Sequence, residues 1–281
     1  MPTATAHPVE PGTMPLSEEK AQALRPITGL WVWQDRWVSD ITEQDKMLDF
    51  AERYGINLFL VQIHQIGGGT LNPRLAYPKQ LARLIEEAGK RGITVEALDG
   101  AKDQASAENQ PATLAILKMI LEFNAGLTGE YRLGGVHYDI EPYILPGWQE
   151  AQSRQVIMYD LVDFFADAKQ MIAEDEAAVA MGFTLSSDIP MWYDAMGQDA
   201  TLEFNGKTAN LHQHIQDLCD YIGIMSYRTH GTGDNSVSYH IENEVAYAES
   251  IGKFVCGALE TLELPDTPQI TFYGKSAESF F

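Results

Sequence analysis

The sequence predicts an α/β fold, a (β/α)8 TIM barrel, from three observations. From about residue 27, short apolar runs alternate with amphipathic stretches, which is typical of βα units with helices covering a parallel sheet. A chain of 281 residues, 45% of them hydrophobic, has the size of one such barrel. Gly55 and Gly92 stand just before two apolar runs, where glycine closes a helix as its C-cap. We expect a flexible segment over residues 1–26, followed by a barrel catalytic domain over residues 27–281.

The elements are expected in βα order. Strands are predicted at residues 29–33, 57–64, 93–98, 134–140, 179–186, 221–226 and 254–260, and helices at residues 43–54, 79–91, 112–123, 153–174, 211–219 and 242–251. The eighth unit is the exception. Residues 269–273 follow the seventh strand too closely for a parallel crossover, which needs a dozen or more residues. Either these residues are a loop or irregular strand, or the barrel is incomplete at its C-terminal eighth unit.

Composition narrows the partners. Nineteen basic residues against 40 acidic ones give a net charge of −21, which repels phosphate backbones and anionic lipids, so neither nucleic acid nor a membrane is expected. Both cysteines, Cys219 and Cys256, are expected as buried thiols. The N-terminus lacks a basic and apolar signal, so the chain as written is expected in the cytoplasm, or secreted if a signal was removed. No feature indicates an oligomeric state.

Catalytic groups of a barrel stand where its strands end. These positions are rich in carboxylates, amides and aromatic rings: Trp33, Gln34, Asp35, Gln62, His64, Asp99, Asp139, Glu141, Ser187, Asp188, Tyr227, Arg228 and Glu260. In the fourth strand, His137, Asp139 and Glu141 share one face, because side chains alternate along a strand. Buried acids beside an imidazole are costly, so the cluster indicates function, with a structural ion pair as the alternative.

This strand resembles the fourth-strand motif of glycoside hydrolase family 18, D-x-x-D-x-D-x-E. Glu141 and Asp139 match its last two acids, whereas Gly134 and His137 stand where the family has aspartates. Met225-Ser226-Tyr227-Arg228 is similar to the family's M-x-Y-D, with Arg228 in place of aspartate. The resemblance implies that Glu141 is the general acid, Asp139 its partner and Tyr227 a donor to the substrate. Two neighbouring carboxyls repel, which raises the pKa of one of them.

Glu260 suggests a second layout. Retaining glycosidases of the large clan A group use the ends of the fourth and seventh strands, here Glu141 and Glu260, as acid/base and nucleophile. The asparagine that precedes the fourth-strand glutamate in that group is Ile140 here. A structural role for Glu260 is the alternative.

The predicted function is therefore hydrolysis of a glycosidic bond in a carbohydrate, without metal or cofactor. Aromatic rings near the strand ends would stack on sugars or, alternatively, pack in the core. The expected substrate-binding residues are Trp33, Gln62, His64, Asp99, His137, Tyr143, Trp192 and Arg228. Two other classes stay open: a non-catalytic carbohydrate-binding barrel, and a metal-dependent sugar isomerase or hydrolase that uses His64, His137 and Asp139. His212 and His214 are expected on an exposed helix surface.

Overall fold

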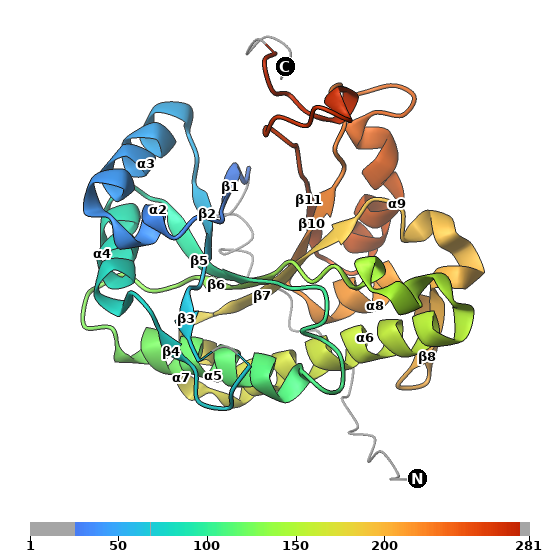
Figure 1. Ribbon diagram of the computed structural model, residues 1–281, viewed down its shortest axis with the longest axis horizontal. Helices are drawn as coiled ribbons and strands as arrows, with labels where there is room; N and C mark the ends of the chain where they lie inside the picture. Colours follow the sequence, from blue (N-terminus) through green and yellow to red (C-terminus); the bar gives the residue numbers. More distant parts are fainter. Residues whose placement is uncertain (1–25, 68, 276–281) are drawn as a thin grey trace.

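The protein is an α/β barrel with an open wall. The computed structural model describes residues 26–67 and 69–275, so the expected flexible segment lies almost entirely outside the described residues. Seven parallel strands form one curled sheet in the order β1-β2-β5-β6-β7-β10-β11 (Figure 1). The strands are β1 (Gly29–Val32), β2 (Leu58–Gln62), β5 (Thr94–Asp99), β6 (Gly135–Tyr138), β7 (Thr184–Pro190), β10 (Tyr221–Met225) and β11 (Phe254–Gly257).

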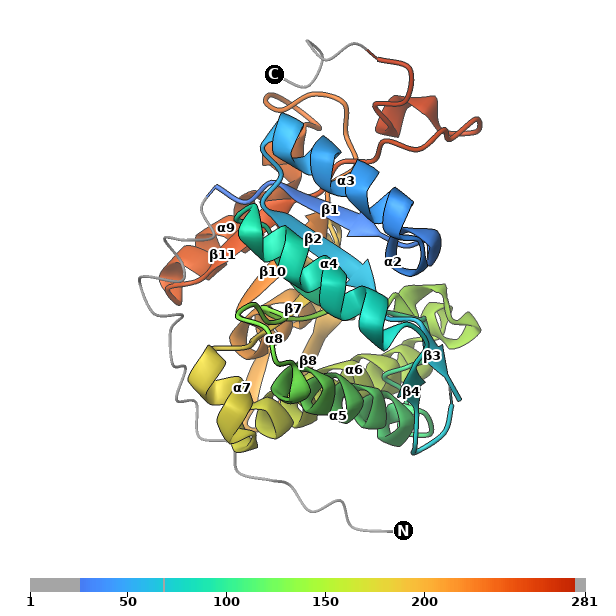
Figure 2. The ribbon, with the colours of Figure 1, turned by 90° about the vertical axis from the view of Figure 1, so that its left-hand side faces the viewer.

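Helices cover the outer face of this sheet (Figures 1 and 2). They are α2 (Arg36–Ser39), α3 (Ile41–Tyr54), α4 (Pro78–Lys90), α5 (Gln110–Gly126), α6 (Ala151–Glu174), α7 (Glu176–Met181), α8 (Leu211–Leu218) and α9 (Val237–Ser250). Two small antiparallel pairs decorate the loops, β3 (Gln65–Ile66) with β4 (Arg74–Leu75) and β8 (Thr201–Phe204) with β9 (Lys207–Asn210). Short 3₁₀ helices lie at Pro142–Ile144, Pro146–Gln149, Asp194–Ala200 and Pro268–Ile270.

Local chemistry sets the ends of these helices. The Asp40 side chain accepts hydrogen bonds from the backbone N–H groups of Thr42 and Glu43 and so begins α3. Gly55 ends α3 with a left-handed φ of 68°, and Gly92 follows α4 with φ of 72°. The glycine stops predicted from the sequence are therefore confirmed.

Strand alternation separates two apolar regions. Tyr138 of β6 faces outward and packs edge-on against Phe164 of α6, within the large core between sheet and helices. The inner face holds a smaller cluster that includes Leu60, Leu98 and Tyr221, with Trp31 packed against it. His137 is fully buried on this inner side, near Trp31 and Tyr221. The opposite orientations predicted for His137 and Tyr138 are confirmed.

The fifth strand was placed too early by the sequence pattern. Residues 176–181 form the short helix α7, begun by the Asp175 side chain and ended by Gly182 with φ of 58°, and the strand runs from Thr184 to Pro190. An unbroken apolar run hid this helix. Asp188 therefore lies within β7 and on its inner face, in register with Gly223 of β10.

The described residues contain no eighth strand of the main sheet, whose edges are β1 and β11. Thr271 makes one isolated parallel bridge to Glu260, after a single 3₁₀ turn. The segment 269–273 is thus irregular, one of the two alternatives expected, and the fold class is the predicted barrel without a described closing strand.

The exposed positions predicted for His212 and His214 were wrong. His212 and His214 are buried, because short α8 packs against α6 and α9 and turns both rings inward. The Nε2 atom of His214 lies 3.2 Å from the Leu202 carbonyl oxygen, and His212 Nδ1 lies 2.9 Å from Nε2 of Gln216. Cys219 is buried as expected, whereas Cys256 is only half-buried.

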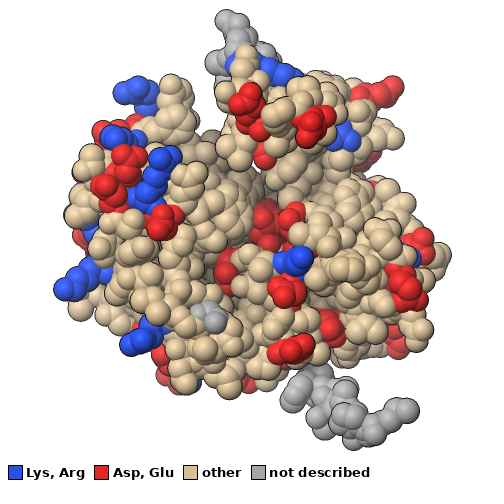
Figure 3. All heavy atoms as spheres, in the orientation of Figure 1, with Lys and Arg blue, Asp and Glu red and all other residues tan. Residues whose placement is uncertain are grey.

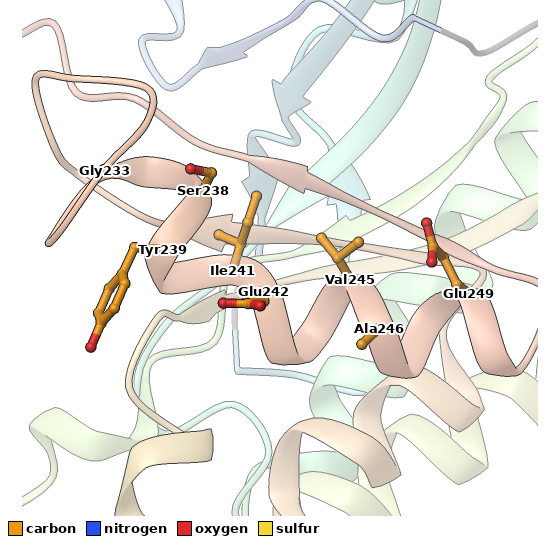
Figure 4. A pocket seen from close by; sticks show the side chains of 8 residues that line it. All are labelled: Gly233, Ser238, Tyr239, Ile241, Glu242, Val245, Ala246 and Glu249. Atoms are coloured by element: carbon orange, nitrogen blue, oxygen red, sulfur yellow. The ribbon is translucent and has the colours of Figure 1, made fainter.

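The outer face of α9 carries a groove of about 580 Å³. Ile241, Val245 and Ala246 line it, and Glu242 and Glu249 lie along the same helix (Figure 4). This groove lies on the helix layer and not at the strand ends. None of the helices in the described part of the chain is long and apolar enough to cross a membrane.

Candidate active site

The hydroxyl of Tyr227 lies in the electrostatic field of four carboxyl groups. Burial and the negative charges of Asp188, Asp139, Glu260 and Glu141 raise the pKa of this phenol, so it stays protonated and can donate a hydrogen bond. The residues follow or belong to β6, β7, β10 and β11, whose carboxyl ends meet at one side of the barrel. In the space-filling view, acidic atoms gather in the central hollow of the molecule (Figure 3).

Asp139 is the most perturbed acid of this group. Burial, with the charges of Asp188 and Glu141, raises its pKa to about 7, while the charge of His137 opposes the shift. Its backbone is fixed, since its N–H donates to the Asp99 carbonyl over 3.0 Å. Gly100 completes the fit, because a Cβ at that position would overlap with the carbonyl of Asp139.

Glu141 stands at the start of an aromatic wall. The Tyr143 hydroxyl donates a short hydrogen bond to its Oε1 atom. Tyr143 lies edge-on to Trp192, with ring centres 5.1 Å apart, and Trp192 is in turn 5.1 Å from Tyr193. Trp148 stacks on Tyr193 at 6.0 Å. Prolines 142 and 146 set this loop as two 3₁₀ turns, which brings Tyr143 back over Glu141.

Beneath Asp139, His137 is tied into a buried polar network. Its Nε2 atom lies 2.9 Å from Oδ2 of Asp188, an ion pair whose alignment falls outside that of a regular hydrogen bond. Its Nδ1 atom lies 2.8 Å from Oγ of Ser186. Trp31 donates its indole N–H to the same Asp188 oxygen over 2.6 Å. Asp188 was recognised as a strand-end acid, but nothing in the sequence indicated that it pairs with His137.

Glu260, whose charge also acts on the Tyr227 phenol, and Arg228 make their hydrogen bonds within their own loops. Glu260 accepts hydrogen bonds at Oε1 from the backbone of Thr261 and Leu262, over 2.6 and 2.7 Å, so this oxygen is held by its own loop. Arg228 donates to Asn235 and to the Tyr227 carbonyl. Neither contact reaches the acid pair.

The side chains of Asp99 and His64 make their contacts elsewhere. Asp99 is buried, and its two oxygens accept from the Gly100 N–H and the Gln104 amide. His64 lies edge-on to Tyr77 and beside a cavity of about 10 Å³ that Gln62 also lines. Burial lowers its pKa, against the charge of Asp35.

Trp33, which follows β1, is 38% exposed. Within residues 26–67 and 69–275, no three His, Cys, Asp or Glu side chains are arranged to hold a metal ion. The metal alternative named His64, His137 and Asp139, and the structure places His64 against Tyr77 and His137 against Asp188.

No protein-family model matches the chain, and a comparison with curated proteins gives no match. Solved structures do resemble it at low identity. A chitinase from Chromobacterium violaceum is 14% identical, over 82% of this chain and 67% of its own, with a TM-score of 0.49. A family 18 N-acetylglucosaminidase from Paenibacillus barengoltzii is 13% identical, over 84% and 68%, with a TM-score of 0.44.

A third similar structure carries another chemistry. A D-psicose 3-epimerase from Clostridium cellulolyticum is 9% identical, over 89% of this chain and 93% of its own, with a TM-score of 0.42. All three are similarities to solved structures at 14% identity or less. Fold does not determine reaction, so the reaction has to be argued from the side chains.

Proposed function

We propose that the chain is a glycoside hydrolase with Glu141 as general acid/base, Asp139 as its partner and Tyr227 as a donor to the substrate. The observation that supports this most is that burial, Asp188 and Glu141, which accepts a hydrogen bond from Tyr143, together raise the pKa of Asp139, while the charges of all these acids and of Glu260 act on the Tyr227 hydroxyl. Among the described residues, Asp188 forms an ion pair with His137, whereas no ion pair joins Asp139, Glu141 or Glu260 to a base. Such an arrangement suits proton transfer to a leaving oxygen.

The acid pair suits the first step of glycosidic cleavage. A proton passes from Glu141 to the glycosidic oxygen as the bond from that oxygen to the anomeric carbon breaks. Water then completes the hydrolysis and returns a proton to Glu141. Because the pKa of Asp139 is about 7, Asp139 is neutral in mildly acidic solution, so the charge formed on Glu141 meets no second full charge there.

The aromatic wall supports a sugar partner. Trp192 is half-buried, and its ring forms part of the wall beside Tyr143, which contacts Glu141. Flat aromatic faces bind the C–H face of a pyranose ring, and a half-buried ring has one side free for such a contact. Trp33, His64, Asp99 and Arg228 take a smaller part in the proposal, because their contacts lie outside the acid cluster.

The decisive experiment is Glu141→Gln tested on aryl glycosides and on oligosaccharides, both N-acetylated and plain. We expect turnover to fall by about 10² to 10⁴-fold with oligosaccharide binding retained. Glu130→Gln, at an exposed loop position, is the matched control. Glu260→Gln tests the second layout, which requires an equally large loss.

Two results would contradict the proposal. Wild-type turnover by Glu141→Gln would remove Glu141 from the chemistry. Binding of oligosaccharides by a wild-type protein that cleaves none of them would favour the non-catalytic carbohydrate-binding barrel.

A further inference from the structure

A chain of buried polar groups crosses the inside of the barrel beneath the acid cluster. Glu96 of β5 is 1% exposed and accepts hydrogen bonds from Tyr221 over 2.8 Å and from Ser186 over 3.1 Å. Ser186 lies 2.8 Å from His137 Nδ1, and His137 Nε2 lies 2.9 Å from Asp188. Thus β5, β6, β7 and β10 all contribute to one connected network.

The hydrogen-bond partners of the two ring nitrogens indicate the charge of His137. The Ser186 hydroxyl has one proton, and two of its other neighbours, Glu96 Oε2 and the Val136 carbonyl at 3.3 Å, are acceptors, while the third, the Tyr221 hydroxyl, gives its own proton to Glu96. Ser186 therefore accepts from a protonated Nδ1. At Nε2, a bare lone pair 2.9 Å from a carboxylate oxygen would be repelled, so this nitrogen also carries a proton. His137 is then an imidazolium.

Strand register connects this pair to the active site. His137 is in register with Ser186, and continuing the same register by two residues places Asp139 beside Asp188. Neighbouring strands are only about 4.8 Å apart. Both carboxyls have one buried oxygen, Oδ1, without a hydrogen-bond partner. Asp188 on β7 is therefore a neighbour of both His137 and Asp139 on β6.

We propose that His137 and Asp188 form a permanently charged buried pair that positions Asp139 and sets the charge against which Asp139 releases its proton. In this arrangement β7 supplies, through Asp188, a carboxylate next to Asp139, and His137 on β6 neutralises it. Both are positioning residues. Their effect on catalysis rests on the proposed function, whereas their charge state is independent of it.

The groups around His137 and Asp139 determine in which direction each substitution should shift the ionisation of Asp139. His137 meets Glu96 from β5, Ser186 and Asp188 from β7, Tyr221 from β10 and Trp31 from β1. Asp139 meets Asp188, Glu141 and His137, with the phenols of Tyr143 and Tyr227 in its field. Removing the Asp188 charge should ease ionisation of Asp139, and removing the His137 charge should hinder it.

The first experiment reads His137 directly. In the full chain with ¹⁵N-labelled histidine, the His137 signals are assigned by their loss in His137→Asn. We expect both ring nitrogens to be protonated from about pH 5 to pH 8. Ser186→Ala should release the Nδ1 proton within this range. Ser187→Ala is the matched control, because the neighbouring hydroxyl donates to the Asp188 carbonyl and not to the ring.

The second experiment follows the Asp139 carboxyl by ¹³C NMR in two variants. Asp188→Asn should lower its midpoint and His137→Asn should raise it, each by about one pH unit, a tenfold change in proton affinity. If the chain is active, the pH limit of kcat/KM should move in the same opposite directions. A purely structural role would reduce activity in both variants without opposite shifts.

An unprotonated ring nitrogen of His137 in the wild type at pH 7 would overturn the proposal. This measurement is made on the wild type, so it does not depend on whether a variant folds. Shifts of the same sign in both variants would overturn it too. Failure of the proposed function would be seen separately, as absent turnover or as an active Glu141→Gln variant. In that case the NMR results alone would still test whether His137 and Asp188 form a charged pair.

Discussion

Asp188 is held from three sides by three strands. Oδ2 receives the indole N–H of Trp31 and faces His137, and the backbone of β10 passes against Oδ1 at Gly223. A Cβ on Gly223 would overlap with that oxygen. The glycine therefore makes room for the carboxyl, and its φ lies outside the left-handed region, so space and not backbone freedom requires it.

Gly223→Ala should accordingly lower the free energy of unfolding by about 1–3 kcal/mol, the usual cost of overpacking. Urea unfolding measures it. In an Asp188→Ala background the same substitution should cost less by about 1 kcal/mol, because the clashing atom is gone. Equal costs in the two backgrounds would mean that Asp188 is not the obstacle. Gly126→Ala, where no atom lies within reach of a new Cβ, serves as control.

The residue scale also shows the limit of sequence reasoning. Asp139 and Glu141 could be chosen because alternation within one strand needs no knowledge of other strands. The partners Glu96, Ser186 and Asp188 depend on register between strands that are about 40 to 90 residues apart. Glu96 was detectable in principle, since it is a lone acid inside an apolar strand.

At the scale of elements, caps and strand ends were more predictable than short helices. Gly55 and Gly92 ended helices as expected, since left-handed φ favours glycine whatever surrounds it. Helix α7 escaped detection, because six residues give too little periodicity to separate a helix from a buried strand. The burial of His212 and His214 depended on the packing of α8 against its neighbours.

A buried lysine, Lys253, links β11 to the end of α8. Lys253, just before β11, donates through Nζ to the carbonyls of Gln216, Asp217 and Cys219 over 2.7, 2.9 and 2.7 Å. These carbonyls end α8, where the helix dipole attracts a cation. Burial nevertheless lowers the pKa of Lys253 to about 8.

Lys253→Met should therefore cost about 2–4 kcal/mol of the free energy of unfolding, because buried carbonyls lose their donor. The measurement is a urea titration at pH 6, where the ammonium is fully charged. Lys118→Met is the control, since Lys118 is 69% exposed and its ion pair with Glu122 is worth little. A loss no larger than that of the control would show that water replaces the ammonium.

At the scale of the whole molecule, the parallel sheet and its helices followed from hydrophobic alternation alone, which is why the fold class was predictable. Closure of the barrel was not. It depends on whether the segment after β11 pairs with β1, and the described residues 268–273 form a turn and a single bridge instead. The net charge of −21 also followed directly from composition. Composition did not show that some of the acidic side chains are buried.

That burial predicts how stability varies with pH. Glu244 of α9 is 0% exposed, neither carboxylate oxygen has a hydrogen-bond partner, and burial with the Asp194 charge raises its pKa to about 7. Asp139 has its pKa raised to a similar value. A carboxyl with a raised folded-state pKa stabilises fully below its unfolded pKa, and this stabilisation is lost as pH rises through about 7. The free energy of unfolding should thus fall between about pH 4 and pH 7 and level off above that range.

Salt and one substitution separate this buried contribution from surface repulsion. Raising NaCl to about 0.5 M should screen the repulsion among exposed acids and leave the buried part of the slope. Glu244→Gln should remove a share of that remaining slope and stabilise the protein above about pH 7, because a neutral amide needs no ionisation. Glu242→Gln, exposed on the same helix, should change only the part that salt already screens. If the slope of Glu244→Gln in high salt equals that of the wild type, Glu244 ionises in the folded protein without penalty, and the pH dependence arises elsewhere.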